Sequence, residues 1–185
     1  MPEIGQAPSD AEVIGRVLGG DTEAFAILVD RYQNTFAAYA KYMTGSLDEA
    51  ADIVQDSLVR AYKALGRCKD RANFKGWLFR IVTNQCKTYL ARRKRRPTES
   101  LDARDDLRAE EDPSGDAEAA EARRRVHAAL QELPVDQREA LVLKYVQGLS
   151  IPEMAEMLKT SVAALKMRLL RGRGALRERL GDLIS

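Results

Sequence analysis

The sequence predicts an all-α fold of two small helical domains, an N-terminal helical bundle and a C-terminal helix-turn-helix domain, joined by an acidic flexible linker. Ala, Leu, Arg, Glu and Lys, which are strong helix formers, dominate the composition. Apolar residues recur at helical spacing, and no alternating apolar run is bounded by hairpin turns. Large apolar residues nearly vanish at 98–118, so we expect domains at 9–97 and 119–185.

The first domain begins with a short helix followed by a long one. The short helix spans about 10–18 and stops at Gly19 and Gly20. Asp21 is a suitable N-cap for the long helix, which Gly45 ends. Residues at core spacing in the long helix are Phe25, Leu28, Val29, Tyr32, Phe36, Tyr39, Ala40 and Met43.

The third helix, at about 48–65, has two different faces. Its expected core residues are Leu47, Ala51, Val54, Leu58, Ala61 and Leu65. Asp52, Gln55 and Asp56 lie on another face. Ordinary solvated polar residues explain that face, and a protein partner with a basic surface is the alternative.

A loop and a fourth long helix complete the first domain. The segment "RCKDRANFK" has no apolar periodicity and predicts a loop; the helix then runs from about Gly76 to Pro97, which stops it. Its inward residues are expected to be Trp77, Leu78, Ile81, Val82 and Tyr89. Its outward residues are expected to be Arg80, Asn84, Lys87 and the basic run 92–96.

The second domain begins with a helix that Pro134 ends, and its apolar face holds Val126, Ala129, Leu130 and Leu133. The segment 136–139 resembles a capping box for the next helix, which Gly148 ends. The apolar residues of that helix are Leu141, Val142, Tyr145 and Val146.

A helix-turn-helix pattern follows. Ser150 and Glu153 form a second capping box, with Pro152 in the first turn. Ser161 can cap the last helix. The inward residues of the two helices are Ile151, Met154, Ala155, Leu158, Leu165, Leu169 and Leu176.

Charge is sharply segregated along the chain. The net charge is only +2, yet 87–96 and 159–179 are basic and 99–121 is acidic. Blocks of this kind mark patches rather than a uniform surface. Two basic blocks separated by an acidic one suggest two contact sites for a polyanion.

Several function classes are disfavoured. The chain has a single histidine, His127, which argues against a Cys/His zinc site and against a His-assisted nucleophile, and it has no P-loop. We therefore expect no catalytic residue, metal or cofactor. Cys68 and Cys86 are interpreted as reduced thiols, with a regulatory disulfide as the alternative. Neither a secretory signal nor a membrane span is visible, which favours the cytoplasm.

Two basic surfaces are candidates for nucleic-acid binding. Lys166, Met167, Leu170 and Arg171 lie opposite the inward leucines of the last helix, where they can enter a major groove; a solvated basic face is the alternative. On the fourth helix, the basic face lies beside two aromatic residues, Phe74 and Trp77. Stacking on these rings favours single-stranded DNA, although a charged helix end with Trp77 in the core fits the same pattern.

In this order, three segments resemble the bacterial RNA polymerase sigma factors of the extracytoplasmic function (ECF) group, within the sigma-70 family. "DEAADIVQDSLVRAYKAL" resembles the polymerase-binding helix, and "FKGWLFRIVTNQCKTYLARRKR" the helix that reads the promoter −10 element. "ALQELPVDQREALVLKYVQGLSIPEMAEMLKTSVAALKMRLLRGRGALRERL" resembles the domain that reads the −35 element. The resemblance covers the chain apart from its N-terminal tail and linker.

The resemblance implies partners and roles for particular residues. Core RNA polymerase would bind Asp52, Gln55 and Asp56, and an anti-sigma factor would be a further partner. The residues implied near an extruded −10 base and its strand are Asn73, Phe74, Arg80, Asn84 and Lys87. The residues implied at the −35 duplex are Lys166, Met167, Leu170 and Arg171, with Arg168 and Arg173 near phosphates.

The sequence departs from the family pattern at the turn and the start of the last helix, and two other functions stay open. Residues 163–167 are Ala-Ala-Leu-Lys-Met where many relatives carry Gly-Thr-Val-Lys-Ser, so Met167 replaces a hydrogen-bonding group by an apolar one. Thr160 stands where relatives usually carry an apolar turn residue. An autonomous transcription regulator would bind duplex DNA without polymerase. An RNA-binding adaptor would bind RNA independently of Lys166 and Arg171.

Overall fold

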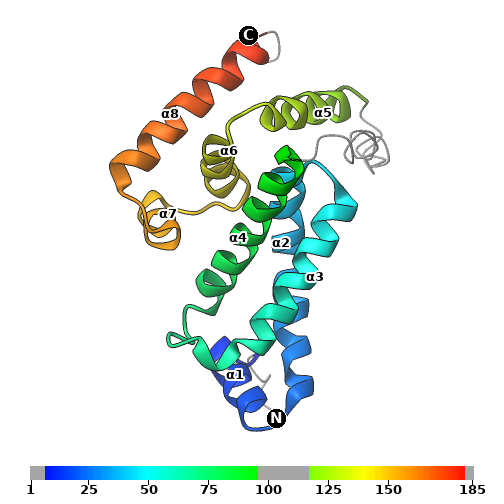
Figure 1. Cartoon of the computed structure of the whole chain (residues 1–185), viewed down its shortest axis with the longest axis vertical. Coiled ribbons are helices and arrows are strands. Elements are labelled where there is room, and N and C mark those ends of the chain that lie inside the picture. The colour runs from blue at the N-terminus through cyan, green and yellow to red at the C-terminus, as the bar shows by residue number, and fades with distance from the viewer. Residues whose placement is uncertain (1–6, 96–116, 182–185) are drawn as a thin grey trace, which may run out of the picture.

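The structure, a computed structural model, describes residues 7–95 and 117–181, and within these ranges every regular element is a helix, as predicted (Figure 1). The first domain comprises α1 (Asp10–Leu18), η1 (Thr22–Ala24), α2 (Phe25–Thr44), α3 (Leu47–Lys63), η2 (Leu65–Arg67) and α4 (Phe74–Arg95). The second comprises α5 (Ala117–Gln131), α6 (Val135–Leu141), the π-helix η6 (Val142–Val146), α7 (Ile151–Leu158) and α8 (Val162–Arg179). No helix in the described ranges is long and apolar enough to cross a membrane.

Most of the predicted linker, 98–118, lies outside the described residues, as does Pro97. Its last two residues belong to α5, which begins at Ala117 rather than at 119. The fourth long helix likewise begins earlier than expected, at Phe74. Both helices therefore begin about two residues before the positions that the apolar spacing predicted.

Side-chain caps set the ends of the early helices. Ser9 and Glu12 form a reciprocal capping box at the start of α1. Asp21 caps η1, the single 3-10 turn that leads into α2, by accepting the Ala24 amide at 3.3 Å. Gly45 ends α2 in the left-handed region at φ 85°, a conformation that glycine adopts without a Cβ penalty.

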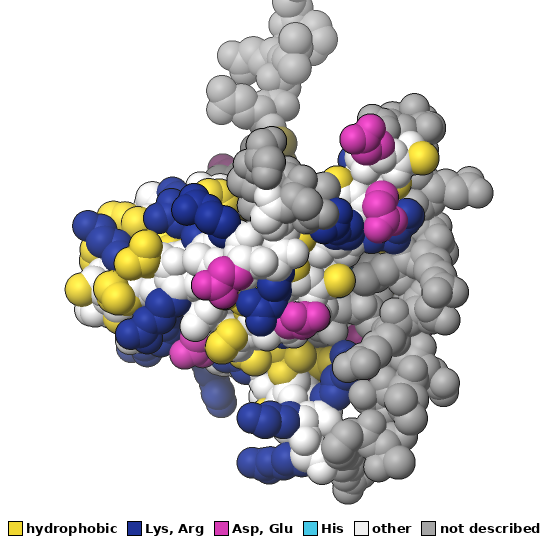
Figure 2. Space-filling model, turned by 90° about the horizontal axis from the view of Figure 1, so that it is seen from above, with side chains coloured by type: hydrophobic (Ala, Val, Ile, Leu, Met, Phe, Trp, Pro, Cys, Tyr) yellow, Lys and Arg dark blue, Asp and Glu magenta, His cyan; other side chains and the backbone are white. Residues whose placement is uncertain are grey.

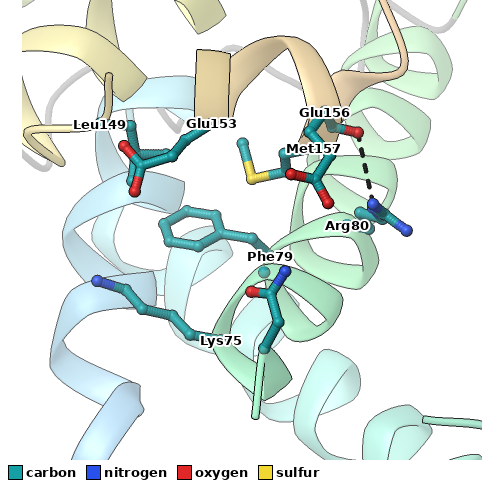
Figure 3. A pocket seen from close by; sticks show the side chains of 9 residues that line it. Lys75, Phe79, Arg80, Leu149, Glu153, Glu156 and Met157 are labelled. Atoms are coloured by element: carbon teal, nitrogen blue, oxygen red, sulfur yellow. Dashed lines mark hydrogen bonds between the residues drawn. The ribbon is translucent and has the colours of Figure 1, made fainter. Parts of the chain in front are cut away.

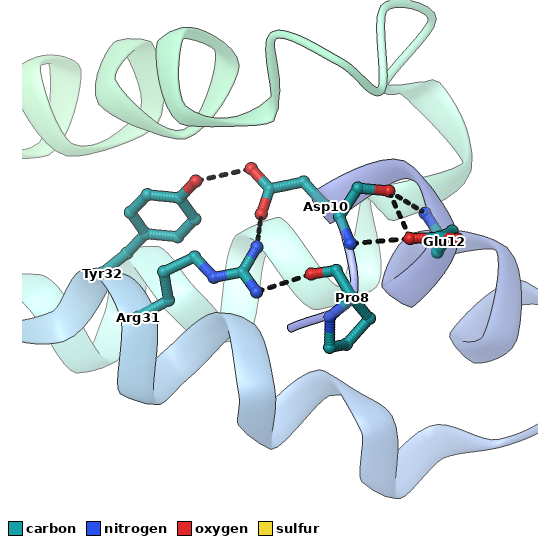
Figure 4. A network of polar contacts seen from close by, with 6 residues as sticks. Pro8, Asp10, Glu12, Arg31 and Tyr32 are labelled. Atoms are coloured by element: carbon teal, nitrogen blue, oxygen red, sulfur yellow. Dashed lines mark hydrogen bonds and ion pairs between the residues drawn. The ribbon is translucent and has the colours of Figure 1, made fainter. Parts of the chain in front are cut away.

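A polar network ties the start of α1 to α2 (Figure 4). Asp10 accepts hydrogen bonds from the Tyr32 hydroxyl and the Arg31 guanidinium, which also donates to the Pro8 carbonyl at 2.7 Å. Burial, with the hydrogen bond and charge of Asp10, raises the pKa of Tyr32 to about 12. These contacts fix α1 across one end of the bundle.

Aromatic rings fill the core of the first domain between α2 and α4. Phe79 lies edge-to-face with Phe36 and Tyr39, at centroid distances of 4.6 and 5.6 Å. On α3 the buried stripe includes Ala50 and Ile53, whereas Ala51 is exposed, so the prediction for Ala51 was wrong. The stripe is rotated because α3 packs against both α2 and α4.

The second domain corrects three predictions. Val126 is 37% exposed, and its neighbour His127 is buried instead. Tyr145 and Val146 are 60% and 40% exposed, because the helix widens into the π-helix η6 and loses the 3.6-residue register. Segment 136–139 is not a capping box: α6 begins after Pro134 without a side-chain cap, and the Glu139 side chain is buried elsewhere.

The two domains pack against each other. α5, α6 and η6 contact α2, and α7 contacts α4 (Figure 1). Buried apolar residues of both domains form one continuous cluster. This arrangement places the second domain over part of the basic face of α4.

Candidate nucleic-acid interface

The helix pair α7–α8 presents its second helix outward. The predicted capping box of Ser150 and Glu153 is present, with Pro152 in the first turn. Lys159 ends α7 in the left-handed region, at φ 50°. Ser161 then caps α8 by accepting the Ala164 amide at 3.0 Å. These caps hold the two helices of the helix-turn-helix at a tight turn.

Close packing against α6 orients α8. Leu165 and Leu169 are buried beneath the helix. A Cβ on Gly172 would lie 2.9 Å from Cδ1 of Leu141, so any larger residue here would force the Leu141 side chain to shift. The side of α8 opposite these residues is therefore fixed toward solvent.

The exposed side of α8 carries the residues predicted for duplex binding. Met167 and Leu170 are 45% and 55% exposed, beside the exposed cations Lys166 and Arg171. Figure 2 shows hydrophobic and basic side chains intermixed where α7 meets the start of α8. A convex helix with cations and apolar side chains on one face fits a major groove.

Arg168 and Arg173, the two α8 residues predicted to lie near phosphates, have different environments. Arg173 is exposed. Arg168 is partly buried and forms an ion pair with Asp136 at 3.4 Å, so one of its sides is already engaged within the domain. The other nitrogen atoms of such a guanidinium can still reach a phosphate.

The start of α4 brings together the predicted strand-binding residues. The Asn73 carbonyl accepts the Trp77 amide at 3.1 Å, so Asn73 is the last residue before the helix, and its side chain is exposed. A Cβ on Gly76 would meet the Asn73 side-chain oxygen at 2.5 Å. Glycine at this position therefore lets the Asn73 side chain fold over the first turn.

Phe74 is not a stacking platform, and this part of the sequence-based interpretation is corrected. Its side chain is fully buried, with its ring 5.9 Å from Tyr32 and 5.7 Å from Trp77. Trp77 is half-buried against it. Phe74 anchors the loop to the core instead, since a base cannot stack on a ring that has no exposed face.

Farther along α4, the basic residues face the second domain. Asn84 is exposed, but the Lys87 ammonium lies 2.8 Å from a carboxylate oxygen of Glu139. Arg80 donates to the Glu156 carbonyl at 3.4 Å. Of the five residues predicted to bind the −10 strand, Lys87 and Arg80 thus contact the second domain.

A cavity of about 150 Å³ lies at this boundary (Figure 3). Lys75, Phe79 and Arg80 of α4 point into it from one side. Glu153 and Met157 of α7 face them from the other. The seam between the domains is therefore incompletely packed and lined by charges of both signs.

The acidic face of α3 is open to solvent. Asp52, Gln55 and Asp56 are all exposed. Val59 and Tyr62, farther along the helix, are 46% and 41% exposed. A patch that combines carboxylates with exposed apolar side chains is suited to a protein partner.

Sequence reasoning missed the two buried charged residues Arg138 and Glu139. In the sequence these two residues were interpreted only as part of a capping box. A helical pattern does not show which charged side chains contact another domain.

Cys68 and Cys86 are both free and buried, and burial raises the pKa of each thiol. No cluster of three metal-ligating side chains occurs among the residues that the structure describes.

Family models match both domains. The model for sigma-70 region 2 matches residues 28–96, and that for sigma-70 region 4 matches residues 123–176. The chain is 32% identical to the RNA polymerase sigma-H factor of Pseudomonas aeruginosa, with 95% of each chain covered. It is 34% identical to the ECF RNA polymerase sigma-E factor of Escherichia coli, covering 95% of this chain and 96% of that one.

The chain belongs to the ECF group of the sigma-70 family. As an ECF sigma factor it acts in promoter-specific initiation of transcription with RNA polymerase. Region 2 comprises most of α2 with α3 and α4, and region 4 comprises α5 to α8.

Two solved structures resemble this fold over most of the chain. CnrH in complex with the cytosolic domain of CnrY is 28% identical, with a TM-score of 0.69 over 95% of this chain and 99% of that one. The sigma factor RpoE in complex with the anti-sigma factor NepR, from Bartonella quintana, is 26% identical, with a TM-score of 0.69 over 85% of this chain and 96% of that one.

Proposed function

We propose that this sigma factor reads the −35 element with α8 and the −10 element with the start of α4, while the exposed face of α3 binds core polymerase. The observation that carries the proposal is the composition of α8, whose outward side combines Lys166 and Arg171 with Met167 and Leu170. A merely solvated helix face would carry mixed charges and few exposed apolar residues.

At the −35 element, α8 enters the major groove. Lys166 and Arg171 reach base edges or phosphates, and Met167 and Leu170 contact thymine methyl groups. Arg168 and Arg173 lie nearer the backbone, where they position the domain without reading sequence. Met167 gives this factor an apolar contact at a position where a hydroxyl would accept or donate a hydrogen bond.

At the −10 element, the start of α4 holds a separated strand. Asn73 and Asn84 offer amide groups to an extruded base, and Arg80 and Lys87 bind phosphates. Phe74 contributes by anchoring the loop that carries Asn73. Two contacts on one tethered chain raise the effective concentration of each, so promoter binding exceeds what either domain achieves alone.

Core polymerase contacts Asp52, Gln55 and Asp56 on α3. The sigma factor supplies no catalytic group and no cofactor, because nucleotide addition is the chemistry of the polymerase. An anti-sigma factor is a further partner, since the two solved relatives are named as complexes with the CnrY cytosolic domain and with NepR. Partners of this kind support a cytoplasmic location for the protein.

Run-off transcription with purified core polymerase tests the polymerase face. We expect wild-type protein to direct initiation from defined start sites, and the pair Asp52→Arg/Asp56→Arg to abolish it while helicity is unchanged. The matched control is Glu23→Arg/Asp30→Arg, which makes the same charge change at exposed positions of the same domain. Normal initiation by the α3 variant would show that polymerase binds elsewhere.

A further inference from the structure

The outward side of α8 has an apolar centre with a cation on each flank. Leu165 and Leu169 are buried and define the inward side of the helix. At about 3.6 residues per turn, the line opposite them consists of exposed residues that are small or apolar: Ala163, Met167, Leu170 and Gly174. Lys166 lies on one side of this line and Arg171 on the other. The part of α8 that would face the floor of a groove is therefore apolar.

Small residues at both ends of this line allow the helix to approach a surface closely. Ala163 lies one turn before Met167, and Gly174 lies one turn after Leu170. A Cβ on Gly174 would meet nothing within 4 Å, so no described part of the chain covers this end. Met167 and Leu170 are therefore the largest side chains along the centre line, and they are the first to meet the floor of a groove that α8 enters.

Side chains that accept hydrogen bonds are missing from this part of α8. Within residues 162–177 no side chain carries an oxygen atom. The Ser161 hydroxyl, just before the helix, already accepts the Ala164 amide at 3.0 Å. Asp136 of α6 is paired with Arg168 at 3.4 Å. The outward side of α8 therefore offers hydrogen-bond donors, from Lys and Arg side chains, and apolar surface.

This composition limits the base edges that the helix can distinguish. In the major groove, adenine and cytosine are identified by amino groups that donate hydrogen bonds, so direct reading of either base requires an acceptor. Guanine instead presents two acceptors, and thymine presents one acceptor beside its 5-methyl group. A donor directed at N7 does not separate adenine from guanine, because both purines have an acceptor there. Cations combined with apolar side chains therefore select guanine and thymine.

We propose that α8 reads only guanine and thymine edges of the −35 element, and that Met167 and Leu170 determine specificity by contacting the 5-methyl groups of two thymines. Lys166 and Arg171 supply the donors for guanine. This inference rests on the proposed role of α8 and adds the class of bases that it recognises. Adenine and cytosine then occur in the element as the complements of the bases that are read.

The methyl contact has a measurable size. A thymine methyl group that packs on Met167 or Leu170 is removed from water, and burial of one such group changes affinity about fourfold. Uracil lacks this methyl group but has the same hydrogen-bonding groups as thymine. The difference in affinity between thymine and uracil at one position therefore isolates the apolar contact from the contribution of the cations.

Replacement of thymine by deoxyuridine tests the methyl contacts. The −35 element is first obtained by selection of bound duplexes from a promoter library randomised in that region, with holoenzyme made from the full-length chain and core polymerase. Each thymine on both strands of the selected element is then replaced singly. We expect two positions at which the holoenzyme binds the uracil duplex about fourfold more weakly than the thymine duplex.

Two alanine variants assign these positions to side chains. The uracil penalty should vanish at one position with Met167→Ala and at the other with Leu170→Ala, which is the coupling that a double-mutant cycle gives for a direct contact. Both residues are exposed and alanine favours a helix, so the fold should be retained. The matched control is Val126→Ala, which truncates an exposed apolar residue of region 4 outside α8 and should keep both penalties.

A third variant, Met167→Gln, adds the missing acceptor. Glutamine pairs with N6 and N7 of adenine, so selection with this variant should place adenine at the position that Met167 reads. The position that Leu170 reads should stay unchanged. Selection of the wild-type element by Met167→Gln would contradict the assignment of Met167.

Two further outcomes would overturn the inference: a selected element in which no uracil substitution weakens binding, or uracil penalties that persist in both alanine variants. Failure of the proposed function is distinguishable from these outcomes. In that case selection with wild-type holoenzyme enriches no −35 sequence, and both proposals fall together.

Discussion

Replacing Phe74 by Ala distinguishes a core role for this ring from a role in base stacking. The side chain has no exposed surface and contacts the rings of Tyr32 and Trp77. Loss of a buried Phe side chain costs about 3–5 kcal/mol of folding free energy, including the cavity left behind. Domains of this size are stable by roughly 5–15 kcal/mol, so the first domain should lose a large part of its stability.

Urea denaturation followed by circular dichroism measures this loss. Phe74→Leu is the control, because it refills most of the volume and should cost roughly 1 kcal/mol, the usual range for swaps that nearly conserve volume. A stacking role predicts the opposite pattern: little change in the urea midpoint of Phe74→Ala and a marked loss of single-strand binding. A destabilisation below about 1 kcal/mol would refute the core assignment.

Three further predictions concern the second domain and the thiols. Gly174→Ala should stabilise region 4 by about 0.5–1 kcal/mol, because a Cβ at this helical position meets open space. Gly172→Ala should destabilise region 4 by about 1 kcal/mol, because its Cβ contacts Leu141. Thermal melts compare the two variants. Cys86, whose pKa burial raises to about 12, should react with Ellman's reagent only slowly from pH 7 to pH 9, since thiolate forms only as pH approaches the raised pKa; rapid labelling of native protein at pH 8 would contradict its burial. Lys166→Ala should weaken binding of holoenzyme to −35 duplex by about 1–3 kcal/mol and reduce the salt dependence, while Arg179→Ala, which removes a cation already paired with Glu132, should change neither in a filter-binding assay.

Helix positions follow from local chemistry and were therefore readable in the sequence. Ser150 with Glu153, Ser161, and Gly45 each mark a helix end through a hydrogen bond or a backbone conformation that involves near neighbours. Local rules of this kind fixed the helix-turn-helix and the outward side of α8. The exposure of Lys166 was predicted for the same reason.

Positions set by tertiary packing were less accessible. Ala51 and Val126 each lie one residue from the true buried position, because apolar spacing gives the period of a helix more reliably than its rotation toward a neighbour. Tyr145 was assigned to the core because the π-helix η6 changes the spacing without a sequence signal that we recognised. Phe74 was placed beside DNA although only its contacts reveal it as core.

The set of side chains that meets the end of α2 has a mechanical consequence. His127, Gln131 and Arg138 engage consecutive carbonyls, from Lys41 to Met43. Hydrogen bonds are short-ranged and directional, so a shift of one residue along the helix would misalign all three together. Region 4 therefore has a single docking position on region 2, and a slightly displaced position would keep few of these hydrogen bonds. Separation should then occur as one all-or-none step, which makes the pair of domains behave as a switch with two positions instead of a loosely sliding joint.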